Sequence, residues 1–170
     1  VGGLAATAGI GESKAARVVA ALELGRRAAT PTSSPMSRVA TSHDVVALVA
    51  PRLRDADVEH FVALALDAKN RPLALIDVAK GSITACPVAP ADVFRAVLRE
   101  AAPAVVFAHN HPSGDPQPSP EDVALTDRLV SAGRLLGIHV GDHVIIAREG
   151  HFSFLDAGLL ARRPPRGVSA

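Results

Sequence analysis

The feature that most constrains the fold is a pair of histidines, His109 and His111, at the end of the apolar run 104–108. If this run is a buried strand, its side chains alternate between two faces, so both imidazoles leave on the same face. A proline-rich loop follows and ends at residues 119–122, Ser-Pro-Glu-Asp, which is typical of a helix start. The order of strand, loop and helix therefore predicts that Asp122 can approach the two histidines.

His109, His111 and Asp122 are predicted to hold a metal ion. Imidazole nitrogen and carboxylate oxygen suit Zn²⁺, and three protein ligands leave a fourth position for water, as in catalytic zinc sites. Without the histidines, Ser119 and Asp122 would be interpreted as helix-capping residues alone. Asp115 is the alternative carboxylate, although its glycine and proline neighbours favour a turn.

The spacing His-x-His-x7-Ser-x2-Asp over residues 109–122 resembles the JAMM motif of MPN/JAB-domain metalloproteases. Its fuller wording is similar to the RadC family, historically called DNA repair proteins, over about residues 41–155. The resemblance implies an α/β fold of the MPN/JAB (cytidine-deaminase-like) kind, with a mixed β-sheet flanked by helices. It also implies zinc-dependent cleavage of an amide bond, peptide or isopeptide, with Glu59 as general base and Ser119 as oxyanion donor.

Several residues near this motif keep alternative interpretations. Glu59 could be a solvated acid at the start of a strand, and Asp55 and Asp57 lie close enough in sequence to compete for its role. The pair Asp142-His143 follows the long helix, and either side chain could orient a ligand histidine from behind. Spacing alone leaves these alternatives open.

The periodicity of the apolar residues predicts an alternation of helices and strands. Within the helix at 90–102, the residues Val93, Phe94, Val97 and Leu98 are expected to face inward. The helix that begins at Thr41 is expected to end before Pro51. The expected helices are 12–25, 41–49, 90–102 and 120–136, and the expected strands are 59–67, 72–78, 104–108, 138–147 and 151–154.

The N-terminal part predicts a second, smaller unit. Residues 1–27 resemble the second half of a helix-hairpin-helix, in which Gly9 and Gly11 would offer backbone N–H groups to a DNA phosphate, beside Lys14. Residues 28–40 are interpreted as a linker, 41–160 as the RadC-like domain and 161–170 as a disordered tail. The alternative function is therefore a DNA repair or recombination accessory protein with a structural metal.

Composition limits the classes of function. The 170-residue chain is 48% hydrophobic and has a net charge of +1, so it is expected to be globular, without a basic field covering the whole surface. With one cysteine, no internal disulfide can form, and the cytoplasm is the expected compartment. Neither a signal peptide nor a membrane span is expected, so a peptide or protein substrate and DNA are the candidate partners.

Overall fold

The computed structural model describes residues 10–29, 38–81 and 88–160. The chain divides into two compact units between Ser37 and Arg38, within the expected linker. Gly9 and the expected tail at 161–170 lie outside the described residues.

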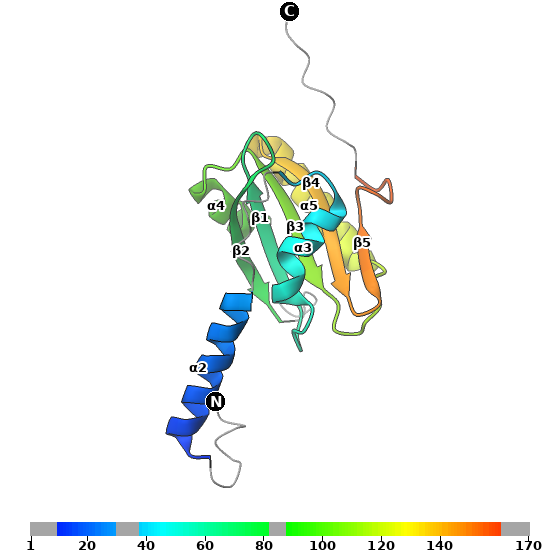
Figure 1. Cartoon of the computed structure of the whole chain (residues 1–170). Helices are drawn as coiled ribbons and strands as arrows, with labels where there is room; N and C mark the ends of the chain where they lie inside the picture. Colours follow the sequence, from blue (N-terminus) through cyan, green and yellow to red (C-terminus); the bar gives the residue numbers. More distant parts are fainter. Residues whose placement is uncertain (1–9, 30–37, 82–87, 161–170) are drawn as a thin grey trace, which may run out of the picture. The chain divides into compact units, whose positions relative to one another are not determined.

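The first unit contains the helix α2, Glu12–Ala29 (Figure 1). It continues four residues past Gly25, where the sequence predicts its end. A glycine costs a helix interior only about 1 kcal/mol relative to alanine, and its neighbours Leu24 and Arg26 are good helix formers. Glycine is therefore too weak a signal to end this helix.

The described residues of the second unit form a five-stranded sheet and three helices, and the strand order is β2-β1-β3-β4-β5. The β3–β4 pair is parallel and the other three pairs are antiparallel. The predicted α/β fold, a mixed sheet flanked by helices, is confirmed (Figure 1). The elements are α3 (Ser42–Leu53), β1 (His60–Leu66), β2 (Pro72–Lys80), α4 (Pro90–Arg99), β3 (Ala104–Asn110), α5 (Pro120–Leu136), β4 (His139–Ala147) and β5 (Gly150–Ser153).

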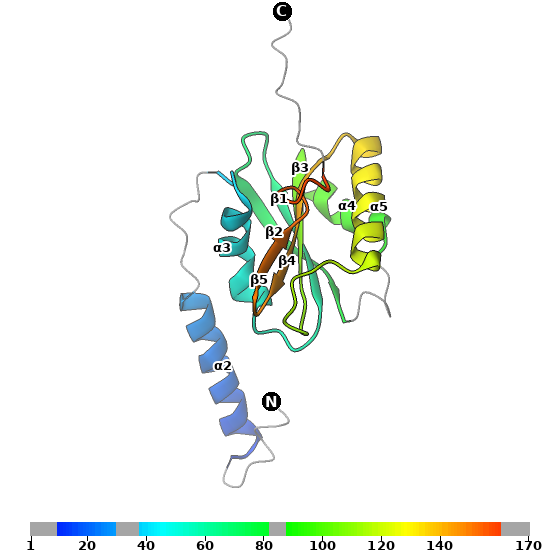
Figure 2. The same ribbon diagram turned by 90° about the vertical axis from the view of Figure 1, so that its right-hand side faces the viewer.

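The sheet forms the middle of three layers, with α3 on one face and α4 and α5 on the other (Figure 2). The central strands are buried on both faces, so their alternating side chains fill two separate cores. In β3, Val105 and Phe107 join the core under α4 and α5, whereas Val106 and Ala108 join the core under α3. This alternation places His109 on the α5 side of the sheet.

Two predictions about helices are wrong in detail. α3 continues through Pro51 to Leu53, because the fully buried Leu53 side chain anchors the last turn and Arg54 N–H donates to the Ala50 carbonyl at 2.9 Å. In α4, Leu98 is 52% exposed although it was expected to face inward. Successive helical residues rotate by about 100°, so Leu98 lies past the edge of the stripe that ends at Val97.

The predicted bounds of α5 agree with the structure. Ser119 is its N-cap and Pro120 its first residue. Gly137 follows Leu136 as the C-cap with φ of 71°, a left-handed conformation that suits glycine. Since α5 begins beside the end of β3, its first turn lies close to His109 and His111.

Candidate metal centre

The side chains of His109, His111 and Asp122 meet at one point, with their ligand atoms within 4.8 Å of one another. His109 lies in β3, and His111 extends this strand because its N–H donates to the Ile146 carbonyl at 2.9 Å. Asp122 lies in the first turn of α5. Among the described residues, these are the three that form a candidate metal-binding group.

The separations between the ligand atoms lie close to those that a small tetrahedral ion requires. The two Nε2 atoms of His109 and His111 lie 2.9 Å apart, and they lie 3.2 and 3.3 Å from the two carboxylate oxygens of Asp122. Tetrahedral zinc with bonds of about 2.0–2.1 Å requires its ligand atoms to be roughly 3.3 Å apart. The two histidine–carboxylate separations match this value, and the separation of the two Nε2 atoms is shorter than it.

The hydrogen bonds of His111 support the same conclusion. Its Nδ1 lies 2.9 Å from the Asp115 carbonyl oxygen, which can only accept, so Nδ1 carries the hydrogen and Nε2 presents a lone pair. This lone pair faces Nε2 of His109 at 2.9 Å. His111 therefore directs a ligand atom toward the point that it shares with His109 and Asp122.

The charge state of the site follows from its contacts. Burial raises the pKa of Asp122, but the adjacent imidazoles of His109 and His111 outweigh this and hold the pKa well below its usual range. The hydrogen bond to Asp122 raises the pKa of His111, against the effect of burial. Asp122 is therefore a carboxylate at neutral pH, ready to pair with a cation.

Asp115 contributes a backbone carbonyl rather than a carboxylate to this site. Its own Oδ1 accepts the Gln117 N–H at 2.9 Å, which closes a turn of the loop. The turn role expected from its neighbours agrees with this contact.

Ser119 caps α5 and also contacts the ligand carboxylate. Its hydroxyl accepts the Asp122 N–H at 3.2 Å and lies 2.6 Å from Asp122 Oδ2, to which it donates. The Ser119 N–H donates to the same oxygen at 2.8 Å. These contacts form a capping box, which fixes the orientation of the Asp122 side chain.

The structure places Glu59 beside the metal site. In the antiparallel β1–β3 pair, Phe61 lies opposite His109, and extending this register by two residues brings Glu59 level with His111. The Phe61 ring stacks on His109 at 6.0 Å, and alternation puts Glu59 on the same face as Phe61. The charge of Glu59 is among the causes that raise the pKa of His111.

The competing acids are less suitably placed. Asp55 and Asp57 are exposed and precede the strand, whereas Glu59 is partly buried at its start. Register and burial therefore favour Glu59 as the acid nearest the cluster.

Asn110 lies between the two histidines, and its role was not predicted. Its Oδ1 accepts the His60 N–H at 2.7 Å, and its Nδ2 donates to the Val58 carbonyl at 3.0 Å. These two backbone groups flank Glu59, so Asn110 fixes the backbone on both sides of it. The feature of the sequence that could have indicated this role is the position of Asn110 between two candidate ligands.

Asp142 and His143 face opposite sides of β4. His143 is fully buried on the α5 side, where its Nε2 lies 2.8 Å from Nδ1 of His109. Its Nδ1 lies 2.6 Å from the hydroxyl of Thr126, a residue that the sequence analysis missed. The signal for Thr126 was its position one helical turn after Asp122.

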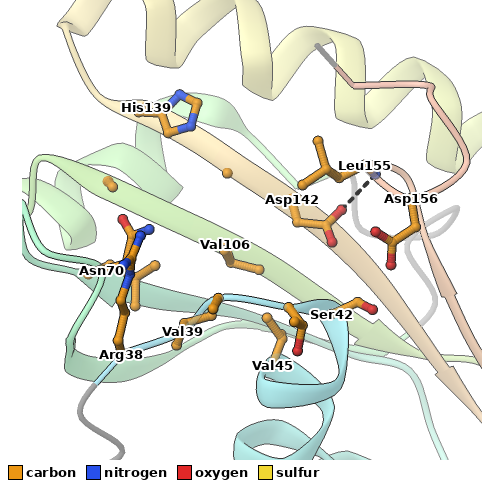
Figure 3. Close-up of a pocket in the computed structure, with 15 residues that line it drawn as sticks. Arg38, Val39, Ser42, Val45, Asn70, Val106, His139, Asp142, Leu155 and Asp156 are labelled. Carbon is orange, nitrogen blue, oxygen red and sulfur yellow. Dashed lines mark hydrogen bonds between the residues drawn. The ribbon is translucent and has the colours of Figure 1, made fainter. Parts of the chain in front are cut away.

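Asp142 instead lines a cavity of about 590 Å³ on the α3 side of the sheet (Figure 3). Its carboxylate accepts the N–H groups of His143 and Leu155 and the hydroxyl of Ser153. Burial raises the pKa of Asp142, and these donors oppose the shift. Asp142 therefore ties the segment after β5 to β4 and does not touch a candidate ligand.

A parallel strand pair joined by a helix that carries the third ligand defines the class of this domain. It is an α/β domain with a candidate metal centre, an arrangement compatible with metal-dependent hydrolysis. A family profile described as RadC-like JAB domain matches residues 39–159. The chain belongs to the RadC-like JAB domain family.

Curated relatives carry the description UPF0758 protein. The one from Syntrophotalea carbinolica is 48% identical over 157 residues, which cover 92% of this chain and 69% of the relative. Those from Desulforudis audaxviator and Methanosarcina acetivorans are 46% and 43% identical, over 92% and 89% of this chain and 68% and 66% of their own lengths. The chain thus spans about two thirds of the length of these relatives.

Outside the candidate metal centre, the start of α2 is the predicted site of DNA contact. Gly11 and Lys14 are exposed at the start of α2. DNA contact through this segment stays a prediction. Among the described helices, none is long and apolar enough to cross a membrane.

Proposed function

We propose that this protein is a zinc-dependent hydrolase that cleaves an amide bond, peptide or isopeptide. The observation that carries the proposal is the convergence of His109, His111 and Asp122, whose ligand atoms lie close to the separations that a tetrahedral ion requires. Membership of the JAB family, which includes metal-dependent hydrolases, supports it. Imidazole and carboxylate ligands favour zinc over magnesium or calcium, which prefer oxygen ligands.

In the proposed reaction, His109, His111 and Asp122 hold the ion. When bound, zinc supplies Lewis acidity, which makes water a stronger nucleophile at neutral pH. Glu59 accepts the proton of the attacking water and delivers it to the leaving nitrogen. Its place level with His111 supports this role.

Ser119 is proposed to stabilise the oxyanion that develops on the substrate. Its hydroxyl hydrogen is directed at Asp122 Oδ2 in this structure, so it must change acceptor during the reaction. The hydroxyl can do so while still accepting the Asp122 N–H, because it has one hydrogen and two lone pairs. Removing one such donor typically lowers the rate by 10²–10³-fold.

The first test is the metal content of the purified protein, measured by elemental analysis. We expect near-stoichiometric zinc in the wild type and none in the His109→Ala/His111→Ala variant. Absence of zinc from the wild type, even after zinc is added back, would contradict the proposal.

The second test is hydrolysis of a mixed peptide library by the zinc-loaded protein, followed by mass spectrometry. Glu59→Gln is the catalytic variant, and Asp57→Asn, at an exposed acid two residues earlier, is the matched control. Glu59→Gln should keep its zinc and lose activity, whereas Asp57→Asn should keep both. Equal activity in Glu59→Gln and the wild type would reject Glu59 as the base.

A further inference from the structure

A buried chain of hydrogen bonds joins two of the candidate ligands from behind. It runs from the Asp122 carbonyl to the Thr126 hydroxyl, on to His143 and then to Nδ1 of His109, with distances of 2.6, 2.6 and 2.8 Å. Thr126 is 2% exposed, and His143 and His109 are 0% exposed. Water therefore cannot substitute for any of these partners.

The Asp122 carbonyl, at one end of this series of hydrogen bonds, sets the direction of all the others. The Asp122 carbonyl can only accept, so the Thr126 hydroxyl donates its single hydrogen there. The same hydroxyl must then accept from Nδ1 of His143. The hydrogen of a neutral His143 is thereby placed on Nδ1.

The contact between His143 and His109 then sets the tautomer of the candidate ligand His109. An uncompensated charged imidazole is costly in a fully buried position, so His143 is neutral and its Nε2 presents a lone pair. That lone pair accepts a hydrogen from Nδ1 of His109. In a neutral His109 with its hydrogen on Nδ1, Nε2 presents a lone pair toward Asp122 and His111.

We propose that Thr126 and His143 are positioning residues that fix the tautomer of His109 and so direct its Nε2 lone pair to the metal. The inference rests on the proposed metal site. His111 achieves the same result with the Asp115 carbonyl, which only accepts. The partner of His109 is instead an imidazole, which can either donate or accept, and the Thr126 hydroxyl behind it can do the same. The direction of these hydrogen bonds is therefore set by the Asp122 carbonyl, which only accepts.

The test uses Thr126→Val, which keeps the shape of the side chain and removes the hydroxyl, and Thr126→Ser, which restores it. Ser153→Ala is the matched control, because Ser153 also makes a buried bond of 2.6 Å but on the other face of the sheet. Two quantities are measured on the full chain. They are zinc affinity by chelator competition, and the tautomers of His109 and His143 by ¹⁵N NMR of the zinc-free protein at about pH 8, above the ordinary histidine pKa near 6.5.

We expect Thr126→Val to weaken zinc binding by about 10–100-fold, as is typical when the partner of a ligand histidine is lost. Without the hydroxyl, His143 should move its hydrogen to Nε2, and His109 should then carry its hydrogen on Nε2 as well. Thr126→Ser and Ser153→Ala should retain the affinity and tautomers of the wild type.

Two outcomes would overturn the inference. One is a wild-type His109 that carries its hydrogen on Nε2, a result that needs no variant to fold. The other is equal zinc affinity in Thr126→Val, Thr126→Ser and the wild type. A wild type that binds no zinc at all would instead reject the proposed function, so the two failures are distinguishable.

Discussion

At the scale of single residues, the alternation of side chains along β3 gives adjacent residues different contacts. His109 faces α5 and the metal centre, and the next residue, Asn110, faces the segment that leads into β1. Since Asn110 binds the backbone groups on both sides of Glu59, one strand positions both a ligand and the proposed base.

Asn110→Ala should therefore separate catalysis from metal binding. Loss of the amide leaves the His60 N–H and the Val58 carbonyl without this partner, at a cost of about 1–3 kcal/mol in the free energy of unfolding. We expect zinc content to be retained and hydrolysis to decrease, because Glu59 is no longer held in place. Urea unfolding measures the free energy of unfolding, and elemental analysis measures the zinc content.

Gln117→Ala is the control, since this side chain is exposed in the loop between the ligands. It should change stability by less than about 0.5 kcal/mol. Loss of zinc from Asn110→Ala would contradict the separation of the two roles.

The convergence of the three candidate ligands could be predicted from sequence because strand alternation and helix capping are local rules. His109 and His111 are two residues apart, and Asp122 follows a recognisable N-cap. The contacts of Asn110 and His143 could not be predicted in this way. They depend on how β3 pairs with β1 and β4, a register that no single segment encodes.

At the scale of elements, the start of α3 depends on a capping box. The Asp44 carboxylate accepts the N–H groups of Ala40 and Thr41 at 2.9 and 2.8 Å, and the Thr41 hydroxyl accepts the Asp44 N–H. α3 packs against β3 and β4 on one face of the sheet, and Val45, Val49 and Leu53 pack into that core. The cap therefore stabilises one of the three layers.

Asp44→Asn should destabilise the domain in a pH-dependent way. The backbone N–H groups of Ala40 and Thr41 lower the pKa of Asp44 below its ordinary value of 3.8. A carboxyl whose pKa is lower in the folded state contributes stability above its unfolded pKa and loses it as pH falls through the folded pKa. We expect a loss of about 0.3–1 kcal/mol at pH 7, measured by urea unfolding.

The difference between Asp44→Asn and the wild type should shrink as pH falls below 3.8. A difference that stays constant down to the acid limit of the folded state would show that the charge of Asp44 is not its cause.

α5 packs tightly against its neighbours at Gly133. A Cβ at this position would lie 2.8 Å from the Ile138 carbonyl oxygen, 2.9 Å from Val140 Cγ2 and 3.2 Å from Phe94 Cζ. The backbone contact cannot yield without moving α5 or β4. Gly133→Ala should therefore cost about 1–3 kcal/mol, despite the better helix propensity of alanine.

Thermal and urea unfolding of Gly133→Ala test this expectation, with Ser131→Ala on the exposed side of the same helix as the control. The control should lie within about 0.5 kcal/mol of the wild type. A stabilised Gly133→Ala would mean that the packing of α5 tolerates a shift of the helix.

The limits of element prediction also have a physical cause. Pro51 would end an isolated helix, yet α3 continues because burial of Leu53 outweighs the lost backbone hydrogen bond. Leu98 was expected inside because it is apolar, although the stripe around Val93 and Val97 was already complete. Tertiary packing overrides the local pattern in both cases.

At the scale of the whole molecule, zinc should stabilise the fold. An ion that binds the folded chain alone adds RT ln(1 + [L]/Kd), about 2.7 kcal/mol at a concentration of 100 Kd. Removal of zinc by a chelator should therefore lower the Tm of the wild type by several degrees, and re-addition should restore it. His109→Ala/His111→Ala should show no response to either treatment. A response of the same size in that variant would place the ion elsewhere.

We propose DNA contact as a separate property of the N-terminal unit. Lys14→Glu should weaken binding to duplex DNA and reduce the salt dependence of the affinity by about one ion, because it removes one phosphate contact. Binding is measured by fluorescence anisotropy over a range of salt concentrations, with Glu59→Gln as a control that leaves it unchanged. Affinity without salt dependence would reject phosphate contact.

The candidate ligands and the proposed base are placed by different parts of the chain. The three candidate ligands come from one continuous segment, β3 to the first turn of α5, so the contacts among them are short in sequence. Glu59 immediately precedes β1 and His143 lies in β4, and these two strands pair with opposite edges of β3. The positions of the three candidate ligands therefore depend on one local segment, whereas the position of the proposed base depends on the pairing of β1 with β3.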